Sequence, residues 1–352
     1  MHKGRVFDVA FGLLLVVVVA TTARPSYMGM DPVSYMSVAL SYGTNNIDEI
    51  HTTVFDEIKR VCPPNVVWEY TSKESPRSKM YYDVTHFEWK MGYHRVKPLY
   101  TALIFLFYKA GFSLSAAAAI PCVASVCLLL LILMAWLLRI VPRPWVYLIV
   151  IGVAISPVVI SLKNLITPDA LATMLAFAMF FAISAKCNKY VVIALMVLML
   201  LARIDYAVLA VVTAYYTYGK NLTKPVYAII AVAALLLAFW AVPVLLGNSS
   251  DWLSMFDFLK SIDKYWLHVQ LVFLVHIRQP YFIFFVAVAC MQLWIGSEEI
   301  KKFMSITAVT FILHLALFPS VEERFFVVYE LLIMVMLFQY ILSYKTPELS
   351  EA

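Results

Sequence analysis

The stretch Met30-Asp31-Pro32-Val33-Ser34-Tyr35 decides how the fold of this chain is organised. It opens the one long polar segment, residues 24–97, of a chain that is otherwise mostly apolar, and hydrophobic runs lie on both sides of that segment. An ionisable side chain close to membrane-spanning segments is a functional candidate by default. Asp31 is therefore the first candidate for a functional residue.

The composition indicates a helical membrane protein with many spans. Of the 352 residues, 63% are hydrophobic and 14% are charged, whereas soluble domains have about 45–50% apolar and about 25% charged residues. Several apolar runs approach the roughly 20 residues that a helix needs to cross a bilayer. The net charge of +5 is scattered along the chain and does not favour nucleic acid as a partner. We expect one all-α membrane domain, residues 1–352, with residues 24–97 inserted as a large extracytoplasmic loop.

Local signals predict short juxtamembrane helices in this loop. Asp31 suits the N-cap of a first helix, because Asp is a favoured cap and a proline follows it. Asn46 starts a second helix in the style of a capping box, and its apolar residues recur at helical spacing until Cys62-Pro63-Pro64 ends it. The apolar run 99–108 is too short to cross a membrane and suits an interfacial or re-entrant helix.

The distribution of Lys and Arg predicts about ten transmembrane helices. The expected spans are residues 7–22, 115–138, 145–161, 168–185, two short halves of 190–219, 226–246, 281–295, 303–318 and 325–343. With the break in 190–219 at residues 203–205, every cytoplasmic segment carries a Lys or Arg, as the positive-inside rule requires. Both termini are then cytoplasmic. Treating 190–219 as one span would place four lysines on the extracytoplasmic side, against the positive-inside rule.

Four short motifs occur in a recognisable order. They are Lys97-Pro98-Leu99-Tyr100, Thr167-Pro168-Asp169-Ala170-Leu171, Leu201-Ala202-Arg203-Ile204-Asp205 and Glu323-Arg324-Phe325-Phe326. Together with an acidic residue soon after the first span, this order resembles the GT-C class of membrane glycosyltransferases over roughly the whole chain. Two features differ from many members of that class: Asp31 has no acidic neighbour, and the last span is not followed by a soluble domain.

The resemblance implies an inverting transfer of a hexose or pentose from a polyprenyl-phosphate donor to a hydroxyl group of a lipid or glycan acceptor. Such a reaction needs a carboxylate that takes the acceptor proton, and cations that stabilise the departing phosphate. Asp31 is the expected general base. The alternative is that Asp31 only caps its helix.

Basic residues on the outer side are expected to bind the donor phosphate. Arg324 is the first candidate, because a guanidinium fork fits phosphate oxygens, and Arg203 is the second. Their alternatives are local ion pairs, of Arg324 with Glu322 or Glu323 and of Arg203 with Asp205. The other candidates for binding the sugar, phosphate or acceptor are Lys163, Asp169, Arg95 and Lys97. Ordinary helix-end or surface charge is the alternative for each of these four.

No metal or other cofactor is expected, since arginines can neutralise a monophosphate, although a divalent cation remains an alternative. The expected partners are the lipid-linked donor, the acceptor and membrane lipid. We expect a multi-pass protein of the plasma membrane, in a bacterium the inner membrane, with its site facing the periplasm or exterior. Two other classes stay open. One is a transporter or flippase of lipid-linked sugar, which broken spans also suit. The other is a non-catalytic subunit of a glycan-assembly complex.

Overall fold

The computed structural model describes residues 2–27, 29–218, 261–278, 280–317 and 326–345. Within these ranges every regular element is a helix, and extended backbone pairs at one bridge, between Ser26 and Leu165. The all-α part of the expected fold is therefore confirmed. The expected span 226–246 and the candidate Arg324 lie outside the described residues.

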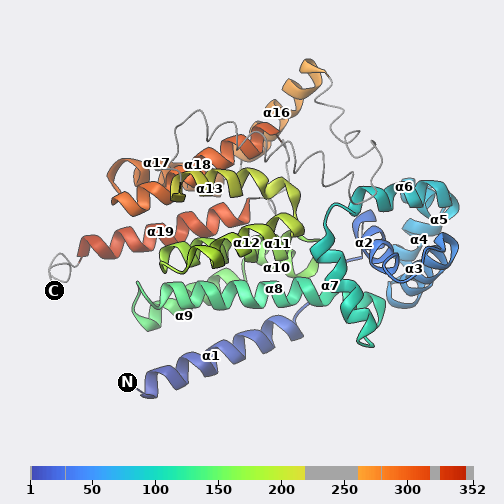
Figure 1. Cartoon of the computed structure of the whole chain (residues 1–352), viewed down its shortest axis with the longest axis horizontal. Helices are drawn as coiled ribbons and strands as arrows, with labels where there is room; N and C mark the ends of the chain where they lie inside the picture. Colours follow the sequence, from blue (N-terminus) through green and yellow to red (C-terminus); the bar gives the residue numbers. More distant parts are fainter. Residues whose placement is uncertain (1, 28, 219–260, 279, 318–325, 346–352) are drawn as a thin grey trace.

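The polar segment forms a group of short helices at one end of the molecule (Figure 1). They are α2 (Met30–Leu40), α3 (Ile47–Val61), α4 (Pro64–Thr71), η1 (Pro76–Ser78), α5 (Lys79–Tyr82) and α6 (Val84–His94). The start of α3 follows the prediction, because the Asn46 side chain accepts hydrogen bonds from two backbone N–H groups of its first turn. The apolar face of α3 is buried at Ile50, Val54 and Ile58, which belong with Phe87 of α6 to the same hydrophobic core as the buried residues of the bundle. We call these elements the outer helices.

The remaining helices form a bundle. In chain order they are α1 (His2–Thr21), α7 (Pro98–Lys109), α8 (Leu114–Leu137), α9 (Arg143–Ala154), α10 (Pro157–Asn164), α11 (Asp169–Ser184), α12 (Lys189–Ala202), η2 (Ile204–Tyr206), α13 (Ala207–Tyr218), α16 (Ile262–Ile277), α17 (Pro280–Ile295), α18 (Glu298–Leu317) and α19 (Val327–Lys345). Helix α11 packs against α8 and α12, and α7 packs against both α8 and the outer helix α2. Helix α7 thus joins the bundle to the outer helices.

The break expected in residues 190–219 is present. Helix α12 ends at Ala202, a 3-10 turn follows, and α13 starts at Ala207. Figure 1 shows α12 and α13 running in opposite directions, so their turn lies at the end of the bundle that faces the outer helices. One expected span is wrong in detail. Residues 145–161 do not form a continuous helix, because α9 and α10 meet at an angle of 59°. Pro157 begins α10, where its missing N–H does no harm.

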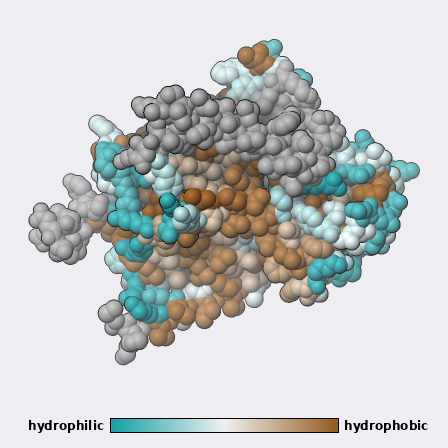
Figure 2. Space-filling model, viewed as in Figure 1, coloured by the Kyte–Doolittle hydropathy of each residue, from teal (hydrophilic) through white to brown (hydrophobic). Residues whose placement is uncertain are grey.

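By length and composition, one described helix, α8, is suited to cross a membrane, and a second is suited if the bent pair α9 and α10 counts as one span. The ten-span topology therefore stays a prediction. Figure 2 shows hydrophobic residues over the middle of the bundle in that view, with hydrophilic residues over the outer helices and at the opposite end. Figure 1 shows the start of α1 and the end of α19 at this opposite end.

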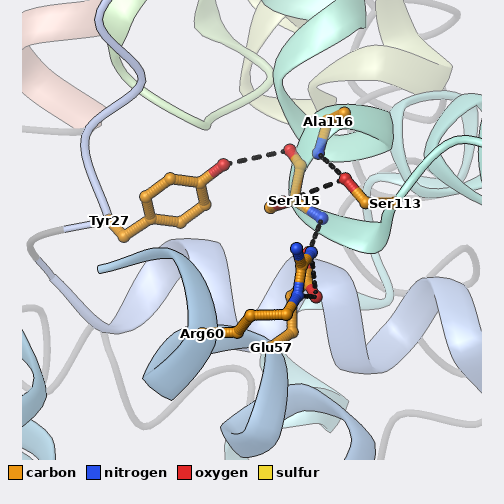
Figure 3. Close-up of polar contacts among 6 residues, drawn as sticks. All are labelled: Tyr27, Glu57, Arg60, Ser113, Ser115 and Ala116. Atoms are coloured by element: carbon orange, nitrogen blue, oxygen red, sulfur yellow. Dashed lines mark hydrogen bonds and ion pairs between the residues drawn. The ribbon is translucent and has the colours of Figure 1, made fainter.

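A clamp of hydrogen bonds fixes the outer helices to the bundle (Figure 3). The Glu57 carboxylate of α3 accepts the backbone N–H of Ser115, in the first turn of α8, at 2.9 Å. Arg60 donates to the same carboxylate at 2.6–3.0 Å. The Tyr27 hydroxyl donates to the carbonyl of Ser115 at 3.1 Å. Burial alone would raise the pKa of Glu57, but the hydrogen bonds from Arg60 and Ser115 outweigh it and hold that pKa below its ordinary value.

Candidate functional site

Asp31 is not the N-cap of its helix, which corrects the expectation. The cap is Gly29, whose φ of 119° is a conformation that glycine adopts readily. No side chain caps this end, and Asp31 lies inside the first turn. Pro32 tolerates this position because the N–H that it lacks would have no partner within the helix. The Asp31 side chain is 40% exposed, and its Oδ1 lies 3.2 Å from Nε2 of His94.

His94 ends α6 and is almost completely buried. Its Nδ1 lies 2.9 Å from the backbone carbonyl oxygen of Lys90. The ring meets the rings of Tyr35 and Tyr93 edge-on, with centroids 4.6 Å and 4.8 Å away. Burial lowers the pKa of His94 below its ordinary value, and the hydrogen bond with Asp31 offsets this only in part. A neutral imidazole therefore stands directly behind a half-exposed carboxylate.

Lys97, at the N-terminus of α7, completes this group. Its Nζ donates to the hydroxyl of Tyr35 at 2.7 Å and lies about 5 Å above the rings of Tyr35 and Tyr93. We call Asp31, Tyr35, His94 and Lys97 the acid–base cluster. Helix α2 supplies its first two members, α6 supplies the third, and the entry into α7 supplies the fourth.

A second group of charged residues lies where the bundle meets the outer helices. Arg203, between α12 and η2, donates from Nε and Nη2 to the two carboxylate oxygens of Asp205, at 2.9 Å and 2.5 Å. Its Nη1 is paired with Asp169, at the start of α11. The hydroxyl of Thr167 donates to the other oxygen of Asp169 at 2.6 Å. His314 of α18 approaches Asp205 at 3.9 Å. We call these residues the arginine cluster.

The two clusters are neighbours. Lys97 of the acid–base cluster interacts electrostatically with Asp205, and Tyr35 does so with Arg203. The fold thus brings together four of the candidates taken from the sequence, namely Asp31, Lys97, Asp169 and Arg203. They come from the outer helix α2, from the start of α7, from the start of α11 and from the turn between α12 and α13.

The other candidates have different surroundings. The Lys163 amino group donates to the hydroxyl of Thr22 at 2.7 Å, and so ties α10 to the end of α1. Arg95 is half-buried, and its guanidinium forms no hydrogen bond or ion pair with the residues that the structure describes. Arg324 cannot be assigned a position, since it is outside those residues.

An apolar cavity of about 260 Å³ lies between α17, α18 and α19. Its wall includes Phe285, Leu293, Phe311, Phe326 and Tyr329. The rings of Phe326 and Tyr329 also lie about 6 Å from the ring of His314, which belongs to the arginine cluster. One wall of the cavity is therefore shared with the charged site.

The site has the parts of an acid–base centre. It holds a carboxylate that solvent can reach, a neutral imidazole behind it, and a lysine ammonium within the same cluster. No group of three or more His, Cys, Asp or Glu side chains suited to a metal ion occurs within the described ranges. The expectation of a metal-free reaction stays a prediction.

No family model matches this chain, and no curated protein or solved structure shows a significant similarity to it. The resemblance to the GT-C class therefore rests on the motifs and their order alone.

Reasoning from the sequence missed His94 and Tyr35. The spacing of eight residues between His86 and His94 is only a weak indication of a metal pair. A stronger signal was available, since His94 precedes the run Arg95-Val96-Lys97-Pro98, where a charged turn leads into the apolar helix α7. Such turns beside a bundle are where functional side chains collect.

Proposed function

We propose that this protein is a membrane-embedded glycosyltransferase of the GT-C type. In this proposal it transfers a sugar from a polyprenyl-phosphate donor to an acceptor hydroxyl with inversion, on the extracytoplasmic side, and Asp31 is the general base. The observation that carries the proposal is the half-exposed Asp31 carboxylate, backed by buried His94, at the junction of the outer helices with the bundle. A base in that position can meet a lipid-linked donor and a water-borne or lipid acceptor together.

Exposed apolar side chains around the bundle support a membrane location. Leu13 of α1, Leu148 of α9 and Val197 of α12 are each about half exposed or more. A soluble monomer rarely exposes large contiguous apolar patches. Hydrocarbon would cover such side chains, and the hydrophilic ends seen in Figure 2 would then lie in the two aqueous phases.

The proposed reaction forms two bonds, the glycosidic bond and an O–H bond on Asp31, and breaks two. The acceptor oxygen attacks the anomeric carbon, and its proton moves to Asp31. The bond from the anomeric carbon to the phosphate oxygen breaks, and its electron pair leaves with the polyprenyl phosphate. Negative charge develops on that phosphate, so a cation beside it stabilises the transition state.

Lys97 and Arg95 are the cations best suited to that phosphate. Lys97 lies in the acid–base cluster, and Arg95 has no carboxylate partner among the described residues. Arg203 is less suited, because Asp169 and Asp205 together already outweigh its single charge. In this proposal the arginine cluster holds the turn between α12 and α13 in place beside Lys97. The apolar cavity next to His314 offers a surface for part of the prenyl chain.

The test compares Asp31→Asn with Asp48→Asn, an exposed residue in the first turn of α3. Purified protein in lipid nanodiscs receives radiolabelled farnesyl-phosphate hexoses and pentoses together with a membrane lipid extract. Because Asn cannot take the acceptor proton, we expect Asp31→Asn to lose transfer about a hundredfold or more. Asp48→Asn should behave like the parent.

The outcomes separate the functional classes. Full transfer by Asp31→Asn would remove Asp31 as the base. Movement of labelled donor between the leaflets of sealed proteoliposomes, with no new glycosidic bond, would identify a flippase. Neither transfer nor movement in the parent, with every donor, would identify a non-catalytic subunit.

A further inference from the structure

The two ring nitrogens of His94 have different partners, and their roles follow from those partners. A backbone carbonyl oxygen can only accept a hydrogen bond. Nδ1, which lies 2.9 Å from the carbonyl oxygen of Lys90, must therefore carry a proton and donate it. The tautomer of a histidine is set in this way by the hydrogen bond that one nitrogen makes.

The other nitrogen then has a lone pair. Burial favours the neutral ring, and a neutral imidazole carries one N–H. Nε2 accordingly presents its lone pair to Oδ1 of Asp31, 3.2 Å away. With Asp31 ionised, a lone pair of Oδ1 would face the lone pair of Nε2, which is unfavourable. A protonated Asp31 would donate an O–H···N hydrogen bond instead.

The surrounding groups do not remove this preference for a protonated Asp31 beside Nε2 of His94. The titratable or charged side chains that interact with the ring are Asp31 and Tyr35 on α2, Tyr93 on α6 and Lys97 at the start of α7. Tyr70 on α4 interacts electrostatically with Asp31. The hydroxyl of Tyr70 is bonded to backbone carbonyls of residues 27 and 29, so it does not compete for Asp31. Lys97, whose amino group donates a hydrogen bond to the hydroxyl of Tyr35, disfavours the protonated His94 ring and so also favours the neutral form.

We infer that His94 is a positioning residue, which raises the affinity of the Asp31 carboxylate for the proton that the acceptor hydroxyl gives up and orients the carboxyl group once it is protonated. This inference rests on the proposed function, in which Asp31 is the base. The proton moves from the acceptor oxygen to Asp31, where the O–H bond can point at Nε2 of His94, and water removes it after product release. No other reactant is needed. The raised affinity brings the carboxylate nearer to the proton affinity that suits a general base at neutral pH.

The kinetic test uses His94→Gln, with His86→Gln on the same helix as the matched control. A glutamine amide nitrogen in place of Nε2 would donate to Asp31 and stabilise its ionised form. We therefore expect the acid limb of the kcat/KM profile to move down by about one pH unit and kcat to fall about tenfold. The KM for the farnesyl-phosphate sugar should not change. A purely structural role would lower the yield of folded protein without moving the pH profile.

A second measurement needs neither activity nor a variant that folds. The pair His94-Arg95 is the one His-Arg sequence in the chain, so labelled histidine and labelled arginine together assign this ring in NMR spectra. We expect a neutral ring with its proton on Nδ1 at pH 7. A proton on Nε2, or an unchanged pH profile in His94→Gln, would overturn the inference while leaving Asp31 as the base. An inactive parent would overturn the proposed function, and the ring tautomer would still decide whether His94 presents a lone pair to Asp31.

Discussion

Glu57 is the residue whose replacement tests most directly how the outer helices are held on the bundle. Glu57→Ala removes a carboxylate that is only 10% exposed and that accepts the backbone N–H of Ser115 at 2.9 Å. That N–H belongs to the first turn of α8, where it has no partner within the helix. The change therefore removes a hydrogen bond and leaves a helix donor without its protein partner.

The magnitude follows from the contacts. A hydrogen bond to a charged group contributes about 1.5–3 kcal/mol. The pair with Arg60 adds little, at most about 1 kcal/mol, because the Arg60 side chain is 60% exposed and water screens it. We expect Glu57→Ala to lower the free energy of unfolding by about 2–3 kcal/mol. Glu57→Gln keeps an acceptor oxygen and should cost about 1 kcal/mol.

The assay is thermal unfolding in detergent, followed by intrinsic fluorescence. For a chain of this length, a loss of 2–3 kcal/mol should lower the midpoint by about 3–4 °C. Asp56→Ala is the matched control, since Asp56 is the preceding residue of α3 and its side chain is 66% exposed. The pH dependence gives a further check. Because the folded pKa of Glu57 is lowered, its contribution is present above the ordinary value near 4.5 and is lost as the pH falls below it. An unfolding midpoint of Glu57→Ala equal to that of Asp56→Ala would refute the reasoning.

Three other predictions concern the arginine cluster, the buried histidine and the topology. Arg203→Ala leaves two buried carboxylates without their shared cation, so it should cost about 3–5 kcal/mol and sharply reduce the yield of folded protein on size-exclusion chromatography. The pKa of His94 in the folded protein is below its ordinary value near 6.5, so below that pH the unfolded chain binds more protons than the folded chain. Denaturant titrations should therefore show a free energy of unfolding that falls as the pH drops below 6.5, and this fall should be smaller in His94→Gln. In right-side-out vesicles a membrane-impermeant maleimide should label exposed Cys187 only after the vesicles are opened, whereas buried Cys122 should stay unlabelled. Labelling of Cys187 in closed vesicles would contradict the expected topology.

Local signals in the sequence determined several elements of the fold. Asn46 and Cys62-Pro63-Pro64 predict the bounds of α3, because capping and proline act within one turn of the residues concerned. The apolar run 115–138 predicts α8 to within one residue at each end. The charged residues 203–205 predict the break between α12 and α13, since ionisable groups interrupt an apolar run visibly.

Tertiary structure alone decided the site. Asp31 and His94 are 63 residues apart in the chain, and they meet because α2 and α6 pack against each other. The same holds for Arg203, whose pair with Asp205 was weighed as an alternative but whose second partner, Asp169, comes from another helix. The sequence favoured Asp31 as a cap, whereas Gly29 caps α2, because a first-turn proline is compatible with more than one helix start. Caps and breaks depend on neighbours within a few residues, but a contact between two helices depends on how all their side chains fit together, which no short motif encodes.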